Sequence, residues 1–196
     1  LALVGGCATT QPQTPEPAVK AETRSVITTP AFVAVIASEG DTLGTLAKQY
    51  LNDESMDWFI AEYNDVDVLK PGQQLIIPLK PYARGGLSPS GYQTVPVLSY
   101  HNFSLSKPNK MTVAKAAFEE QMDFLKAKGY RVVSMDQLFE FLDFKSQLPK
   151  KSVVITIDDG WRSAYDIALP ILRKHGYPAT LFVYTDLITG REKTLS

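Results

Sequence analysis

The sequence has few residues that could cross-link the chain or bind a metal: one cysteine, Cys7, and two histidines in 196 residues. A single cysteine excludes an intrachain disulfide. No run approaches the roughly 20 apolar residues that a membrane-spanning helix needs. The net charge of −1 gives no basic surface for nucleic acid, so we expect no nucleic-acid partner. The 44% of hydrophobic residues is sufficient for folded cores.

The first residues resemble an export signal. Leu1 to Gly6 resemble the end of a signal peptide, and Val4-Gly5-Gly6-Cys7 resembles a bacterial lipobox. This resemblance implies a lipid on Cys7 and attachment to a membrane; an incidental cysteine is the alternative. Ala8, rather than aspartate, follows the cysteine, so we expect a cell-envelope lipoprotein at the outer membrane of a Gram-negative host. The Pro-, Thr- and Gln-rich residues 8–30 predict a disordered tether, and we assign residues 1–31 to signal remnant, lipobox and tether.

Residues 32–80 predict a small unit of strand, helix, helix and strand. The segment "FVAVIAS" is typical of a strand, and "EGDT" follows it with Asp41 or Thr42 as a helix cap. A second short helix is expected from Ser55, with Trp58 in its core face. Pro71-Gly72 turns the chain into the strand "QLIIP".

Three blocks of this unit, "EGDTLGTLAKQY", "IAEYN" and "LKPGQQLIIP", resemble the LysM family in order and spacing. The resemblance implies a βααβ fold that binds glycans containing N-acetylglucosamine, such as peptidoglycan or chitin. The groove of the family maps to Gly40-Asp41-Thr42-Leu43 and to residues 65–69. Capping and turn formation remain the alternative role of Asp41 and Thr42.

Residues 81–94 predict a linker, and residues 95–196 predict an α/β unit. Strands are expected at "VPVLSY", "YRVVS", "SVVITI" and "ATLFVY", with helices between them. Thr112 is expected to cap the first of these helices. This alternation indicates a parallel sheet or barrel, and in such folds ligands gather at the carboxyl ends of strands.

Asp158 and Asp159 stand at such an end, directly after the strand "VVITI" and before Gly160. Neighbouring carboxylates repel each other, and a divalent cation relieves that repulsion. One carboxylate can then hold the ion while the other acts as general base toward water. From spacing alone, capping of the next helix by an Asp-Asp-Gly turn is favoured over this use.

The blocks "VPVLSYHNF", "FEEQMDFLKAKGYRVVSMDQL" and "LPKKSVVITIDDGWRSAYDIALPILRKHGYPATLFV" resemble the first half of a polysaccharide deacetylase of the NodB-homology (carbohydrate esterase 4) type. The resemblance implies an incomplete (β/α) barrel. It also implies Asp158 as general base and Asp159 as ligand of a divalent metal, with zinc the expected ion. His101, in "SYHNF", would contact the active site; a loop histidine bonded to the backbone is the alternative.

Roles are also expected for Trp161, Arg162 and His175. Trp161 would either stack on a sugar or pack, and Arg162 would either orient a carboxylate or not contact the site. His175 precedes Gly176 near a helix end, where a cation suits the helix dipole, so we interpret it as a surface residue.

The chain departs from the deacetylase pattern in one respect. The resemblance implies a downstream His-x-x-x-His pair, and neither histidine here has that spacing. Because a catalytic zinc normally takes three protein ligands, we expect this chain to be an inactive fragment of a surface-anchored N-deacetylase that acts on a peptidoglycan-type polysaccharide. The alternative is a non-catalytic, lipid-anchored LysM glycan-binding protein with a remnant deacetylase unit. Ester hydrolysis and an exopolysaccharide substrate stay open.

Overall fold

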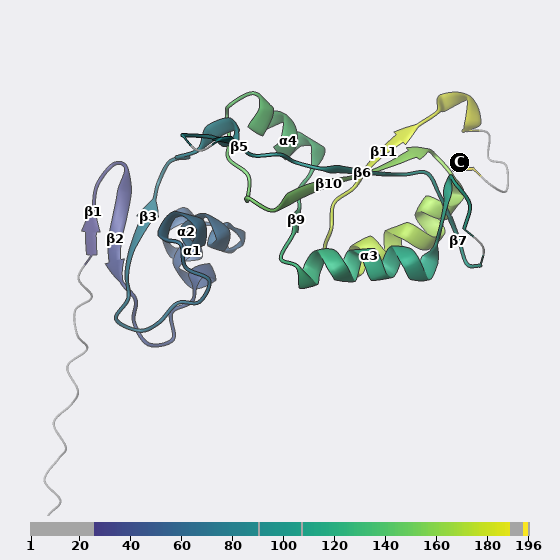
Figure 1. Ribbon diagram of the computed structural model, residues 1–196. Coiled ribbons are helices and arrows are strands. Elements are labelled where there is room, and N and C mark those ends of the chain that lie inside the picture. The colour runs from purple at the N-terminus through teal and green to yellow at the C-terminus, as the bar shows by residue number, and fades with distance from the viewer. Residues whose placement is uncertain (1–25, 90, 107, 189–193, 196) are drawn as a thin grey trace, which may run out of the picture.

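The computed structural model describes residues 26–89, 91–106, 108–188 and 194–195. They form two folded units that follow one another along the chain, with a short hairpin segment between them (Figure 1). Cys7 and the tether up to residue 25 lie outside the described residues. Within these ranges, no helix combines the length and apolar character needed to cross a membrane.

The first unit is an antiparallel sheet covered by two helices. Its strands, in the sheet order β1-β2-β3, and its helices are β1 (Val26–Thr28), β2 (Phe32–Ile36), β3 (Gln74–Pro78), α1 (Leu43–Leu51), η1 (Glu54–Met56) and α2 (Asp57–Asn64). Strand β1 corrects the predicted tether, because Val26 pairs with Val35 of β2. The core consists of side chains from both layers: Val33, Val35, Leu46, Ala47, Ile60, Leu75 and Ile77.

Helix α1 begins where the sequence predicts. The Thr42 hydroxyl accepts the Thr45 backbone N–H at 3.0 Å, and the Thr45 hydroxyl lies 2.9 Å from the Thr42 backbone nitrogen, which donates to it. This capping box satisfies donors that a helix start leaves unpaired. Helix α1 ends at Leu51, and its C-cap residue Asn52 adopts a left-handed backbone conformation with φ of 61°.

The second unit is built on a parallel sheet. Before it come η2 (Arg84–Gly86) and the small hairpin of β4 (Leu87–Ser88) and β5 (Gly91–Tyr92). Its elements are β6 (Val97–Tyr100), β7 (Asn102–Ser104), β8 (Thr112–Ala114), α3 (Lys115–Ala127), β9 (Arg131–Val132), α4 (Met135–Leu142), β10 (Ser152–Asp159), η3 (Ala164–Ala168), α5 (Leu169–His175), β11 (Thr180–Val183) and η4 (Thr185–Leu187). Strand β10 pairs in parallel with β6, β9 and β11. The predicted α/β class is confirmed.

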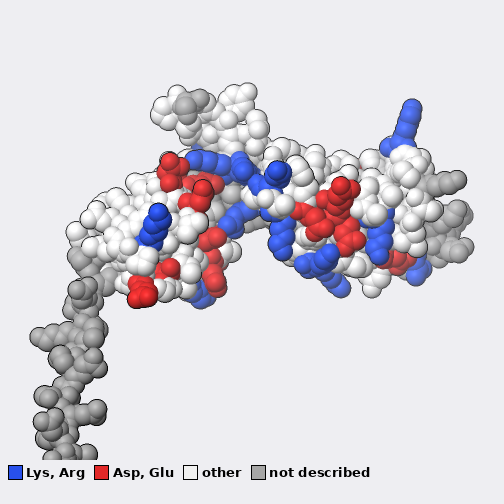
Figure 2. Space-filling model, turned by 60° about the horizontal axis from the view of Figure 1, so that its bottom comes forward, with Lys and Arg blue, Asp and Glu red and all other residues white. Residues whose placement is uncertain are grey.

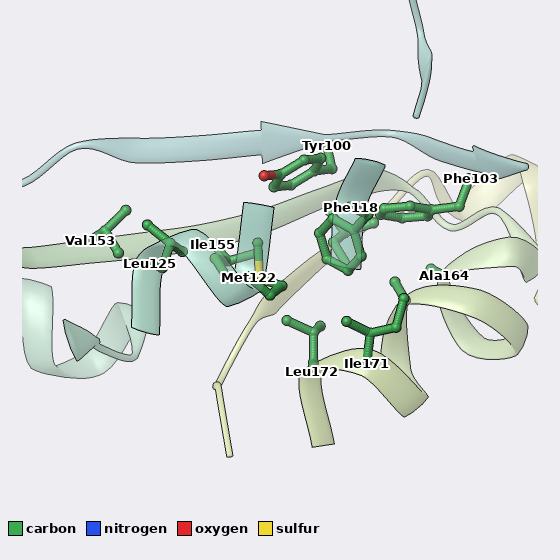
Figure 3. Close-up of a cluster of buried hydrophobic side chains, with 12 residues drawn as sticks. Tyr100, Phe103, Phe118, Met122, Leu125, Val153, Ile155, Ala164, Ile171 and Leu172 are labelled. Atoms are coloured by element: carbon green, nitrogen blue, oxygen red, sulfur yellow. The ribbon is translucent and has the colours of Figure 1, made fainter. Parts of the chain in front are cut away.

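Strand β10 is covered on both faces over most of its length. Alternate residues of the strand point toward α3 and α5. These are Val153, Ile155 and Ile157, which pack in one cluster with Phe118 and Met122 (Figure 3). Val154 points to the opposite face and packs with residues of and around α4. A strand that is buried on both faces needs apolar residues at nearly every position, which explains the segment "VVITI".

One predicted cap in this unit is wrong. Thr112 belongs to β8 and its side chain lies 3.4 Å from the Asn102 amide nitrogen. Helix α3 begins at Lys115 after Ala114, which has no capping side chain. Thr112 instead takes part in the parallel pairing of β7 with β8.

The two units are joined by charged contacts at the amino ends of β9 and β10. One guanidinium nitrogen of Arg131 donates to both carboxylate oxygens of Asp57, at 2.7 and 2.9 Å. The Lys150 backbone N–H donates to the Glu62 carboxylate at 2.8 Å. Burial raises the pKa of Glu62, against the lowering effect of that hydrogen bond. Helix α2 is therefore held against the edge from which β9 and β10 start.

We predict that reversing one charge of the Arg131–Asp57 pair separates the units. Asp57→Arg places two cations face to face, and small-angle scattering should show a larger radius of gyration than for the unaltered chain. Because both side chains are more than a third exposed, the pair itself contributes about 1 kcal/mol or less. The exchange Asp57→Arg with Arg131→Asp should restore the compact value; a radius that stays unchanged in the single variant would contradict this docking.

Candidate functional site

Three polar residues, Ser99, His101 and Asp158, lie close together at the carboxyl ends of β6 and β10. Ser99 pairs with Thr156 across the two strands, and the next residues on the same face are His101 and Asp158. The Ser99 hydroxyl donates to the Asp158 carboxylate at 2.8 Å. His101 Nε2 lies 3.8 Å from the same carboxylate oxygen, and both side chains are 29% exposed. The structure thus places His101 near Asp158, and the role of either residue in an active site stays a prediction.

Asp159 faces a different partner. Its backbone has φ of 73°, in the left-handed region that residues other than glycine rarely adopt. Its carboxylate accepts the Trp161 indole N–H at 3.1 Å. The two neighbouring carboxylates therefore bond to separate groups.

Gly160 completes the turn after the strand. Its φ is 79°, and a Cβ atom there would lie 3.0 Å from Cγ1 of Val183. A side chain at this position would crowd Val183 of β11, so both the backbone conformation and the space favour glycine. The Gly160 carbonyl accepts the backbone N–H of Leu195 at 3.0 Å.

The alternative of helix capping by the two aspartates does not fit this geometry. The π-helical segment η3 begins at Ala164 after Ser163, and the Ser163 hydroxyl donates to the Asn102 side-chain oxygen. This bond ties the start of β7 to the start of η3. Asp158 and Asp159 lie upstream in β10, and their carboxylates accept from the Ser99 hydroxyl and the Trp161 indole rather than from the start of the helix.

Two other expectations are corrected or decided by the structure. Arg162 pairs with Asp166 one helical turn later, at 3.3 Å, and orients neither site carboxylate. The His175 side chain is only 3% exposed and stacks on Tyr177 at 5.2 Å between ring centroids, so the predicted surface position is wrong. Tyr177 follows the turn at Gly176 and covers the imidazole ring.

The donors at this end of the sheet do not complete a metal centre. They are two carboxylates and one imidazole, and Ser99 and Trp161 already bond to the carboxylates. Among residues 26–89, 91–106, 108–188 and 194–195, no three His, Cys, Asp or Glu side chains come together as a metal-binding group. A catalytic zinc takes three protein ligands, so these residues alone do not fit zinc.

The predicted glycan-binding residues of the first unit differ in their local structural roles. The Asp41 carboxylate accepts the Ser38 backbone N–H at 2.7 Å, and Thr42 caps α1. Gly40 supports the turn with φ of 83°. Leu43 lies with Asp65, Val66 and Asp67 along one cavity, so the two predicted loops do meet. Whether they bind a glycan remains a prediction.

Sequence reasoning missed Ser99 as a partner of Asp158. The signal was present: Ser99 stands two residues before His101, and alternate residues of a strand share a face. The parallel register of β6 against β10 was needed to connect it to Asp158. The contact of Arg131 with Asp57 joins residues far apart in the chain, and no local pattern predicts it.

Two segments of the chain match known protein families. Residues 37–78 match the family described as LysM domain, and residues 145–196 match the family described as polysaccharide deacetylase. The chain therefore has one segment similar to LysM domains and another similar to part of a polysaccharide deacetylase.

Three curated relatives share the deacetylase part. YxkH of Bacillus subtilis is 36% identical over 89 residues, which cover 45% of this chain and 31% of that protein. The poly-beta-1,6-N-acetyl-D-glucosamine N-deacetylases of Escherichia coli (strain K12) and Staphylococcus aureus (strain MSSA476) are each 37% identical over 84 residues, 42% of this chain. Those residues cover 12% and 29% of the two enzymes, so the matched part is less than a third of each relative.

Among solved structures, the Streptococcus pyogenes deacetylase PplD in complex with acetate aligns with a TM-score of 0.48 and 30% identity. The alignment covers 52% of this chain and 48% of that one.

The backbone at Asp159 gives a stability prediction. Asp159→Val should lower the free energy of unfolding by about 1–2 kcal/mol, because a β-branched residue tolerates the left-handed conformation poorly. Asp159→Asn is the matched control, since asparagine accepts this conformation and its amide oxygen still accepts the Trp161 N–H. Urea unfolding measures both; equal stabilities for the two variants would show that the turn carries no such constraint.

Proposed function

We propose that this chain is part of a hydrolase that removes N-acetyl groups from a polysaccharide of amino sugars. The observation that carries the proposal is the position of Asp158 at the carboxyl end of a buried strand, bonded to Ser99 and close to His101. The deacetylase family match and the names of the E. coli and S. aureus relatives support the reaction type.

The reaction proposed for the site is the hydrolysis of an amide. Asp158, as general base, takes a proton from water, and the water oxygen attacks the acetyl carbonyl carbon. The carbon–nitrogen bond then breaks, acetate leaves, and the sugar nitrogen takes up a proton to become a free amine. His101 is proposed as a second active-site contact on the same face. Ser99 holds the Asp158 carboxylate in place by its hydrogen bond.

Metal dependence is part of the proposal, with Asp159 as one ligand and zinc as the expected ion. Further donors beyond the described residues would be required. The incomplete donor set also supports the second candidate, a LysM glycan-binding protein whose deacetylase unit does not turn over substrate. The two candidates differ in whether acetate is released.

The substrate class is a polymer of N-acetylglucosamine. A LysM domain favours peptidoglycan, whereas the E. coli and S. aureus relatives are named for poly-beta-1,6-N-acetyl-D-glucosamine. Assays on both polymers decide between these substrates, and acetate measured alongside acetylated-ester controls separates N-deacetylation from ester hydrolysis.

We predict that Asp158→Asn slows acetate release by roughly 10²–10⁴-fold in the protein encoded by the complete coding sequence, because a general base is removed. Bound metal, measured by elemental analysis, should be retained. Asp159→Asn is the contrasting variant and should lose metal and activity together. The 196-residue chain itself should release no acetate; clear release from it, or full activity of Asp158→Asn, would show that these roles are wrongly assigned.

Anchoring through Cys7 is a separate proposal, supported by the sequence alone because that residue lies outside the described part of the chain. We predict that Cys7→Ala in the full precursor moves the protein from the membrane fraction to the soluble fraction and abolishes labelling with a fatty-acid analogue. Cys7→Ser, which also lacks the thiol, should behave alike. Labelling that persists in both variants would rule out this anchor, and fractionation of a Gram-negative host tests the outer-membrane expectation.

A further inference from the structure

A cavity of about 420 Å³ lies between the LysM domain and the deacetylase part. Its LysM wall includes Leu43, Trp58, Asp65, Val66 and Asp67, and its deacetylase wall includes Gly129, Arg131, Lys150 and Lys151. The LysM wall contains residues of both loops that the family resemblance assigns to glycan binding. The opposite wall belongs to the other unit.

The two walls are held together by the contacts already described. Arg131 binds both carboxylate oxygens of Asp57, and the Lys150 main chain donates to Glu62. These four residues themselves border the cavity. The deacetylase wall is thus fixed beside the LysM loops by bonds that form part of the cavity rim.

The charges of the cavity are nearly balanced. Four acidic residues, Asp57, Glu62, Asp65 and Asp67, face three cations, Arg131, Lys150 and Lys151. Figure 2 shows cationic side chains where the two units meet, with acidic side chains to either side. Such a wall has no strong preference for an ionic ligand. The wall offers both hydrogen-bond donors and hydrogen-bond acceptors, which suits the hydroxyl and acetamido groups of a neutral sugar.

Trp58 adds an apolar surface to this polar wall. Its side chain is partly buried, and its ring lies 5.5 Å from that of Phe59, edge to face. A few polar groups beside an aromatic ring are typical of small-molecule and sugar sites.

The cavity and the candidate catalytic carboxylates lie at opposite ends of the sheet. Lys150 and Lys151 directly precede β10, whereas Asp158 and Asp159 end it (Figure 1). Eight strand residues at about 3.3 Å each separate the two places by roughly 26 Å. A glycan held in the cavity is therefore bound away from the carboxylates.

We propose that the LysM loops and the base of the deacetylase part form one composite groove for a neutral, N-acetylated glycan, in which Lys150 and Lys151 donate hydrogen bonds to the sugars. This inference rests on the proposed glycan binding by the LysM domain and extends it to residues of the second unit. Both lysines are exposed, and the Lys151 ammonium, which donates to the Lys128 carbonyl at 3.1 Å, keeps two further N–H donors for a ligand.

The test is calorimetric titration of the 196-residue chain with N-acetylglucosamine hexasaccharide and disaccharide. The double variant Lys150→Ala, Lys151→Ala should bind the hexasaccharide about tenfold more weakly, because hydrogen bonds from charged groups are lost. Its affinity for the disaccharide, which the LysM loops alone can hold, should stay within twofold. The matched control Lys115→Ala, Lys126→Ala removes the same charge from exposed positions on α3 and should bind both sugars normally.

The outcomes separate the two levels of the proposal. No binding of either sugar by the unaltered chain would remove the proposed LysM function and this inference with it. Normal hexasaccharide binding by the Lys150, Lys151 variant would overturn the composite groove and leave LysM binding intact. Equal weakening for both sugars, or weakening by the control pair, would indicate a general charge effect and also overturn the groove. Urea unfolding of each variant verifies that the fold is retained.

Discussion

The parallel pairing of β10 with its neighbours is the constraint on which the rest of the second unit depends. This strand is hydrogen-bonded to β6, β9 and β11, and its first six residues are buried. Because its odd-numbered residues pack on α3 and α5 while Val154 packs near α4, a shift of one residue would reverse both faces. The core therefore fixes the register, and the register places Asp158 beside Ser99 and His101.

The same strand also relates the two units. Its amino end follows Lys150 and Lys151 at the docking surface, and its carboxyl end carries the two aspartates. Stability at one end and chemistry at the other is the usual division in parallel α/β folds. The adjacent carboxylates bond to different groups: Asp158 accepts from Ser99, and the left-handed backbone of Asp159 accompanies its bond to Trp161.

Much of this fold could be predicted from the sequence because its signals are local. The helix start at Thr42 and the continuous apolar run of β10 have direct physical causes in a few neighbouring residues. Thr112 is not the cap that the sequence predicts, because threonine suits a strand as well as a cap and its pairing with β7 places it in a strand. The burial of His175 under Tyr177 and the binding of Arg131 to Asp57 depend on tertiary contacts that no local pattern contains.

The central claim is that the face shared by Ser99, His101 and Asp158 receives the N-acetyl group. The most direct measurement is a crystal structure of the protein encoded by the complete coding sequence, grown with an N-acetylglucosamine oligosaccharide. The account predicts an acetamido group within hydrogen-bond distance of the Asp158 carboxylate, on the side where Ser99 and His101 lie. An acetamido group bound elsewhere on the deacetylase unit, with Asp158 directed away from it, would contradict the account.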